Sequence, residues 1–271
     1  MAKINYLNNR DLLREIHKSK ASYCSFLETE DANYDMILPS VDKINRNTIA
    51  EARRLRSDRL ARATWEKVVK ETPKVKIDEF KVDPKKIPNT DLVFRIMTFE
   101  HIPLAPGRKK TPKSKGDHHA KVNFPPFQHY KIDENNEPFC VGKSHWVGGL
   151  ENGHFSKDDG KMTNELAKMF IKLCERYGTR GNWRGYTYND EMRSQALLQL
   201  SQVGLQFDES KSANPFAYYT ATITNSFTRI LNLEKRNQSM RDNILEMNGM
   251  KPSFTRQAEW GNSGGGRGSD D

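Results

Sequence analysis

The most regular pattern of apolar and polar positions lies in the final third of the chain. Between residues 161 and 177, large apolar side chains recur at steps of four, three and one, which is the spacing of one face of an amphipathic helix. A second helix is predicted over about 187–205, after a glycine-rich break. A third is predicted over about 215–246, where Asn214 can cap free N–H groups and Pro215 takes the first helical position without losing a hydrogen bond. Three such segments in succession predict a compact helical module.

The rest of the chain carries weaker periodicity. Asn8 or Asn9 can cap a short helix that continues to Lys20. An arginine-rich helical pattern over about 47–70 is more often a salt-bridged surface helix than a nucleic-acid contact. Residues 73–159 are rich in Pro, Gly, Lys and His, with short strand-like pieces. We predict a mainly α fold in four parts: an N-terminal helix that packs on the module (1–36), a long, mixed or partly disordered insertion (37–160), the module (161–247) and a flexible C-terminal tail (248–271).

Composition points to a polyanionic partner. The chain is 35% hydrophobic and 29% charged with a mean hydropathy of −0.83, which is lean for one well-buried globule. Its 44 Lys and Arg against 35 acidic residues give a net charge of +9, which favours nucleic acid through counterion release. Cys24, Cys140 and Cys174 lie far apart without a CxxC pair, which argues against a zinc ribbon or a disulfide framework. We expect no cofactor, no metal and no membrane, and a soluble protein inside a cell.

The third predicted helix carries the side chains best suited to nucleic acid. Phe216, Tyr219 and Phe227 share one face with two isoleucines and should be at least partly buried, while adjacent faces offer small polar side chains and then cations. Aromatic rings can stack on unpaired bases, small polar side chains and Arg can read base edges, and cations can hold phosphates. An ordinary amphipathic helix with a basic end has the same spacing, and spacing alone favours that simpler interpretation.

Two other segments suggest different chemistry. His118, His119, Asn123 and His129 loosely resemble a histidine-rich nuclease metal site, although they lack a convincing strand–helix frame. A basic run either binds phosphates without sequence preference or is a solvated linker. The alternatives to specific DNA binding are therefore a non-specific basic nucleic-acid-binding accessory protein and, less favoured, a metal-dependent HNH-like nuclease. The basic run comprises Arg108, Lys109, Lys110, Lys113, Lys115 and Lys121.

Several short blocks occur in a fixed order along the chain. They are Asn5-Tyr6-Leu7-Asn8-Asn9-Arg10-Asp11-Leu12-Leu13, Gly185-Tyr186-Thr187, Glu191-Met192, Gly204-Leu205-Gln206-Phe207-Asp208-Glu209, Asn214-Pro215-Phe216-Ala217-Tyr218 and Phe227. In order and spacing these blocks resemble region 2 of sigma factors, and more closely the late-transcription sigma factors of T-even-like bacteriophages. The resemblance covers roughly residues 3–25 and 161–245.

The resemblance implies a specificity subunit of RNA polymerase that is not itself an enzyme. Such a subunit binds the host polymerase core at the clamp helices of the largest subunit and directs recognition and melting of a short AT-rich −10-like promoter element of late genes. A phage coactivator and the sliding clamp are further partners of the family, and the implied location is the cytoplasm of the infected bacterium, at the nucleoid. The implied polymerase-binding residues are Asp190, Glu191, Gln195, Gln199 and Gln202. The implied DNA-binding residues are Phe216, Tyr218, Tyr219, Thr222, Asn225, Ser226, Arg229, Lys235 and Arg236, with Tyr219 stacking on a flipped base.

The chain also departs from the family pattern. Thr222-Ile223 stands where major sigma factors have a tryptophan pair, and the turn before Phe216 is one residue longer, so the stacking role can fall on Tyr218 instead of Tyr219. Little chain follows the third helix, which implies that promoter choice rests on the −10-like element without a −35 reader. The Gly- and Ser-rich end lacks a recognisable form of the motif with which the family binds the sliding clamp. We can place no family counterpart of the predicted insertion.

Overall fold

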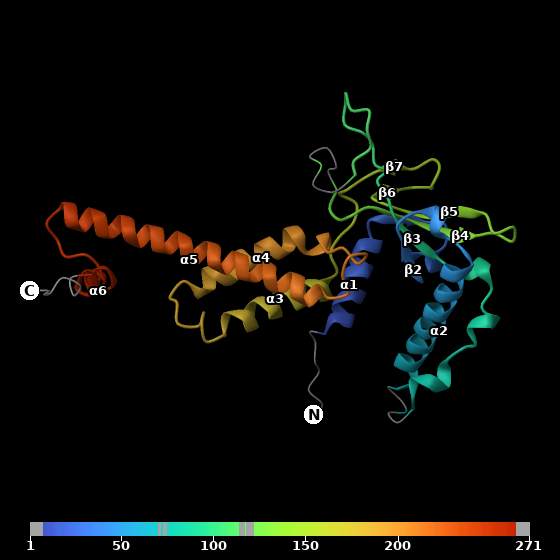
Figure 1. Cartoon of the computed structure of the whole chain (residues 1–271), viewed down its shortest axis with the longest axis horizontal. Coiled ribbons are helices and arrows are strands. Elements are labelled where there is room, and N and C mark those ends of the chain that lie inside the picture. The colour runs from blue at the N-terminus through green and yellow to red at the C-terminus, as the bar shows by residue number, and fades with distance from the viewer. Residues whose placement is uncertain (1–7, 70–71, 73–74, 114–116, 118–121, 264–271) are drawn as a thin grey trace, which may run out of the picture. The chain divides into compact units, whose positions relative to one another are not determined.

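The computed structural model describes residues 8–69, 72, 75–113, 117 and 122–263, and Figure 1 shows its elements. About 52% of the chain is helical, in agreement with the mainly α prediction, and a five-stranded mixed sheet accompanies the helices. The chain divides into two compact units. We call residues 1–169 with 203–216 the sheet unit, and residues 170–202 with 217–271 the helical unit.

The sheet unit is built on five strands in the order β1-β5-β4-β3-β2. Neighbouring strands are antiparallel, except that β2 runs parallel to β3 with Met36 opposite Phe94. The strands are β1 (Cys24–Phe26), β2 (Met36–Leu38), β3 (Phe94–Met97), β4 (Phe127–Ile132) and β5 (Pro138–Ser144), and β6 (Trp146–Val147) pairs with β7 (His154–Phe155) in a separate ribbon. The long helices of this unit are α1 (Asn9–Ala21) and α2 (Arg46–Val68). Short 3-10 helices are η1 (Thr29–Ala32), η2 (Val41–Lys43), η3 (Ile77–Phe80), η4 (Pro84–Lys86), η5 (Asn89–Asp91) and η6 (Gly204–Gln206).

Helix α2 packs on the sheet through small and branched side chains and is fixed by ion pairs. Ala52 is fully buried in one apolar cluster with Phe94, Ile96 and other strand residues. Arg56 and Arg59 both reach the buried Asp35 carboxylate, and the Arg59 Nη2 to Asp35 Oδ1 distance is 2.6 Å. The charges of these two arginines are therefore balanced by ion pairs within the protein, as expected of a salt-bridged surface helix.

The sheet overturns the prediction that residues 37–160 form a separate insertion. Strand β2 crosses the predicted boundary, since it begins at Met36 and pairs with β3. Strand β1, which precedes the boundary, pairs with β5 through Cys24 and Ser144. Residues on both sides of the boundary therefore build one sheet, because backbone N–H and C=O groups of each strand need a neighbouring strand as partner.

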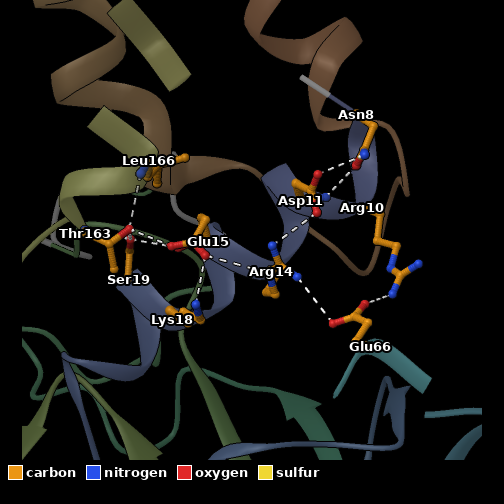
Figure 2. A network of polar contacts seen from close by, with 10 residues as sticks. All are labelled: Asn8, Arg10, Asp11, Arg14, Glu15, Lys18, Ser19, Glu66, Thr163 and Leu166. Carbon is orange, nitrogen blue, oxygen red and sulfur yellow. Dashed lines mark hydrogen bonds and ion pairs between the residues drawn. The ribbon is translucent and has the colours of Figure 1, made fainter. Parts of the chain in front are cut away.

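Helix α1 is held by a polar network that Figure 2 shows from close by. The Asn8 side chain caps the helix by accepting from the Asp11 backbone N–H at 2.7 Å. Farther along, the buried Glu15 accepts from the Thr163 hydroxyl at 3.1 Å, and the Thr163 N–H donates to the Ser19 hydroxyl at 3.0 Å. Thr163 precedes α3, so these bonds join α1 to the segment that leads into α3.

A buried ion cluster lies at the centre of the sheet unit. The Lys20 ammonium, with its side chain 1% exposed, donates at 2.6 Å both to the Phe207 carbonyl and to the Glu209 carboxylate. Burial raises the pKa of Glu209, but the attraction of Lys20 and Arg95 outweighs it, so the net shift is downward and the carboxylate stays ionised. The 207–209 turn is therefore joined to α1 by a desolvated ion pair.

Arg95, on β3, extends this cluster among aromatic rings. Its guanidinium carbon lies 3.9 Å from the centre of the Tyr34 ring and 3.8 Å from that of Phe127. The Arg95 Nε donates to His129 Nε2 at 3.0 Å, and a second nitrogen lies 3.2 Å from His17 Nδ1. Burial and the nearby arginine lower the pKa of His17 to about 3 and that of His129 well below its ordinary value, so both imidazoles stay neutral.

The helical unit takes its core from aromatic side chains. The Phe170 and Tyr219 rings meet edge to face with 4.8 Å between their centres, and Phe227 contacts Tyr177 and Trp183 in the same manner. The Tyr177 hydroxyl lies 2.6 Å from the Thr224 hydroxyl. The helices of this part of the chain are α3 (Asn164–Gly178), α4 (Asn189–Val203), α5 (Pro215–Met247) and α6 (Phe254–Ser263), so three of them match the predicted ones closely.

Helix α6 corrects the prediction of a flexible tail over 248–271 as far as residue 263; residues 264–271 lie outside the described residues. The Asp242 carboxylate on α5 accepts from both the backbone N–H and the hydroxyl of Ser253, at 2.7 and 2.8 Å. Glu246 pairs with Arg256 at 2.8 Å. These contacts tie the first turn of α6 and the residue before it back onto α5. Among the described residues, no helix combines the length and the apolar character needed to cross a membrane.

Candidate nucleic-acid interface

The start of α5 is positioned by α1. The Phe216 backbone N–H, in the first turn of α5, donates to the Asn9 side-chain oxygen at 3.0 Å. This contact satisfies one of the N–H groups that a helix leaves without an intrahelical partner at its beginning. Phe216 belongs to the sheet unit. Its side chain is 36% exposed and therefore accessible from solvent.

Two of the predicted DNA-binding residues lie in the core instead. Tyr219 is fully buried, with its ring edge to face against Phe170, so neither face of the ring is open to a base. Ser226 is 5% exposed, and its hydroxyl donates to the Thr222 carbonyl at 3.0 Å. The stacking role predicted for Tyr219 and the base contact predicted for Ser226 are therefore wrong in this conformation. Both residues follow the helical spacing of Ile223 and Phe227, which place them on the inward face.

The remaining polar candidates share the outward face of α5. Tyr218, Thr222, Asn225 and Arg229 recur at steps of four, three and four, and Arg236 continues the row two turns later. Tyr218 and Thr222 are half-buried, whereas Asn225, Arg229 and Arg236 are exposed. Burial raises the pKa of Tyr218, so its hydroxyl remains protonated at neutral pH. One helix face thus presents an aromatic ring, a hydroxyl, an amide and two guanidinium groups in succession.

A groove on the helical unit brings several of these side chains together. It has a volume of about 630 Å³, and Asn225, Arg229 and Arg236 of α5 line it together with Gln195 of α4. Arg and Asn or Gln side chains are the donors that read base edges and phosphates. Gln195, which the sequence resemblance predicts to contact polymerase, lies in this groove beside the predicted DNA contacts. The other lining residues, which the sequence analysis did not single out, are Thr228, Ile230, Asn232 and Leu233.

The predicted polymerase contacts lie on the accessible sides of α4. Glu191 and Gln202 are exposed, while Gln195 and Gln199 are half-buried at steps of four along the helix. The inward face of the same helix buries Met192, Ala196 and Leu200. Asp190 is exposed and forms an ion pair with Arg193. All five predicted residues are thus open to a partner to some degree.

Lys235 lies apart from this row. It lines a different hollow of about 440 Å³ with Asp242, Thr255 and Arg256, where the chain before α6 returns to α5. The structure thus separates the two cations that the sequence analysis grouped as phosphate contacts: Arg236 borders the groove, and Lys235 does not.

The nuclease alternative loses one of its three histidines. His129 is fully buried in the Arg95 cluster, where its Nδ1–H donates to the Asp31 carbonyl at 2.6 Å and its Nε2 accepts from Arg95, so it has no open position for a catalytic metal. Asn123 bonds the Lys157 carbonyl. His118 and His119 lie outside the described residues, as do Lys115 and Lys121 of the basic run. Within the part of the chain that the structure describes, no group of three or more His, Cys, Asp or Glu side chains is placed to hold a metal ion.

Comparison of the chain with protein-family models, curated proteins and solved structures gives no significant match.

Proposed function

We propose that this protein is a promoter-specificity subunit that binds a bacterial RNA polymerase core and captures the opened strand of a short AT-rich element. The observation that carries the proposal is the outward row of α5, from Tyr218 to Arg229. A single-strand binding site needs an aromatic platform for a base and cations for the phosphates on either side of it. This row offers both within four turns of one helix, with the Gln195 side chain beside it.

Tyr218 takes the stacking role in this proposal. It lies one residue before the buried Tyr219, its ring is partly accessible, and the two rings meet edge to face with 5.4 Å between their centres. A ring supported from one side by a core aromatic has little rotamer freedom to lose on binding a base, which favours stacking. Arg229 and Arg236 would contact phosphates, and Asn225 would face a base edge or sugar.

The experiment is transcription in vitro with the full-length chain and bacterial core polymerase on an AT-rich late-type promoter. Accurate initiation is expected with the wild-type chain. Tyr218→Ala should reduce open-complex formation roughly tenfold, since stacking contributes about 1–3 kcal/mol per base. Lys168→Ala, which removes an exposed cation on α3, is the matched control and should initiate normally. Permanganate reactivity of thymines in the element reports strand opening directly.

The proposal fails if the chain does not bind core polymerase, or if Tyr218→Ala opens the promoter as well as the control does. Affinity that is independent of sequence and of Tyr218, with a steep dependence on salt, would instead favour a non-specific nucleic-acid-binding accessory protein.

A further inference from the structure

The second half of α5 carries an exposed apolar stripe, which consists of Leu233, Met240, Ile244 and Met247. These side chains are 48%, 50%, 58% and 86% exposed. They follow one another at steps of seven, four and three, so they lie on one face of the helix at the core positions of a heptad pattern. Ile230 and Asn237 complete that pattern, in which most core positions are apolar and one is an amide.

The opposite side of this part of α5 is already covered. Asp242 is bonded to Ser253, and Glu246 is paired with Arg256 in α6. The Met250 N–H donates to the Leu245 carbonyl at 2.8 Å. The stripe therefore faces away from the intramolecular packing of α5 and offers a row of large apolar side chains to a partner. A row of exposed apolar side chains along one helix face is a candidate interaction site.

We propose that the stripe is the contact between two copies of this chain, with their α5 helices packed antiparallel. In the register that sets Met240 against Asn237 of the second copy, Glu234 lies across from Arg241 of the second copy. The twofold axis repeats this pair, so the contact has two attractive ion pairs at its borders. The two Asn237 amides fall in neighbouring central layers, where each can reach the other.

In the same register, Met247 meets a hollow on the second copy that can accommodate its side chain. Met247, the most exposed residue of the stripe, falls opposite Ile230 of the second copy. Ile230 and Leu233 form the apolar part of the groove of about 630 Å³ described above. An unbranched methionine side chain adapts readily to such a groove. The protruding end of the stripe and the hollow near its beginning are thus complementary, as a twofold contact between identical helices requires.

A parallel arrangement fits the same residues less well. It would place Arg236 beside Arg241 of the second copy and set Met247 against Met247, which leaves the groove unfilled. The stripe spans residues 230–247, which is about 27 Å of helix, and at a helix width of about 10 Å it covers roughly 300 Å² on each copy. Two copies would bury roughly 600 Å² together, which is below the range of stable interfaces of about 1,200–2,000 Å², so the dimer should be weak and reversible.

Sedimentation velocity of the full-length chain, from low micromolar to several hundred micromolar, tests the proposal. The wild type should shift from monomer to dimer over this range. Met240→Glu/Ile244→Glu should remain monomeric throughout, while Leu198→Glu, a matched change at a 52% exposed leucine of α4, should dimerise as the wild type does. Circular dichroism confirms that each variant keeps its helices. A wild-type chain that stays monomeric, or a stripe variant that dimerises normally, overturns the proposal.

Charge exchange tests the orientation. Arg241→Glu sets Glu234 against a second carboxylate and should weaken the dimer at least threefold, and Glu234→Arg/Arg241→Glu should restore it. In a parallel pair, Arg241→Glu would instead relieve the repulsion with Arg236 and strengthen association. Strengthening by this single substitution therefore overturns the antiparallel arrangement. The dimer and the proposed DNA contact would compete for the same groove, because Arg229 and Arg236 border the hollow that receives Met247. The measurement itself tests the dimer alone, since neither polymerase nor DNA enters it.

Discussion

Replacing Glu209 with Gln removes the carboxylate that contacts the buried ammonium of Lys20 and is attracted electrostatically by Arg95. The Lys20 and Glu209 side chains are 1% and 8% exposed, so water cannot take over the lost interaction. Removing one partner of a buried ion pair costs about 3–5 kcal/mol, because the remaining charge is left desolvated and unpaired. We expect Glu209→Gln to lower the free energy of unfolding of the sheet unit by this amount, with two cations left facing one another.

The opposite substitution should cost less. Lys20→Met leaves Glu209 charged but still near Arg95, which lowers the pKa of that carboxyl and keeps it compensated. The double variant Lys20→Met/Glu209→Gln should therefore be more stable than Glu209→Gln alone, although Arg95 remains buried without its carboxylate. This order of stabilities is specific to a cluster with two cations and one carboxylate.

Urea unfolding at neutral pH, followed by circular dichroism and tryptophan fluorescence, measures these differences. Lys18→Met is the matched control on the same helix, since its ion pair with Glu15 involves a lysine side chain that is 56% exposed. Such pairs contribute about 0–1 kcal/mol. If Glu209→Gln costs no more than Lys18→Met, or if Lys20→Met is the more damaging single change, the cluster is solvated in solution and the reasoning is wrong.

Three further outcomes are expected. Tyr219→Ala truncates a core side chain and should lower the free energy of unfolding in urea by about 3–5 kcal/mol. Tyr218→Ala should lower it by under about 1 kcal/mol and should instead weaken binding of single-stranded DNA, measured by fluorescence anisotropy. The reverse pattern would mean that Tyr219 lies at the surface. His17 binds a proton in the unfolded chain near its ordinary pKa of 6.5 but in the fold at a pKa lowered by burial to about 3, so stability should fall as pH drops through that window. His17→Gln should flatten the slope of unfolding free energy against pH by up to about one proton, and an unchanged slope would contradict the burial of this ring. Gly142→Ala should lower the free energy of unfolding by about 1–3 kcal/mol, because a Cβ there meets the packed ring of Phe26. Gly149→Ala has open space around it, so its free energy of unfolding should stay within about 0.5 kcal/mol of the wild type. Equal stability of the two variants would refute the packing argument.

The helical part of the chain was predictable because its signals are local. Apolar side chains repeat at helical spacing through α3, and Asn214-Pro215 marks the beginning of α5 within one residue. Tyr219 shows which signal to follow at the candidate site. Its spacing from Ile223 and Phe227 predicts an inward position, and the structure places it there, whereas alignment to sigma factors pointed to a surface role. Helical spacing was the better guide, because burial follows the face of the helix and not the identity of the residue.

One strand-like piece predicted from the sequence, residues 92–99, contains β3, but the pairing of the sheet could not be predicted because the partner strands are distant in the chain. Strands β1, β2 and β3 are only three or four residues long, and all three of the first residues of β3 are buried, so period-two alternation is absent. Arg95 adds to the difficulty, because an arginine normally signals solvent. Its burial depends on two aromatic rings and two neutral histidines that come from other elements.

The buried pair of Lys20 and Glu209 also has a consequence for how the chain is made. The two residues are 189 positions apart in the sequence. At a synthesis rate of about 5–20 residues per second, Glu209 therefore leaves the ribosome about 10–40 s after Lys20. During this interval the growing chain can pair its strands, but burial of Lys20 in its native position would leave its ammonium desolvated and without a carboxylate partner. The nascent sheet unit therefore waits for the 207–209 turn, and a ribosome stalled between these positions would hold a chain that chaperones and proteases treat as unfinished.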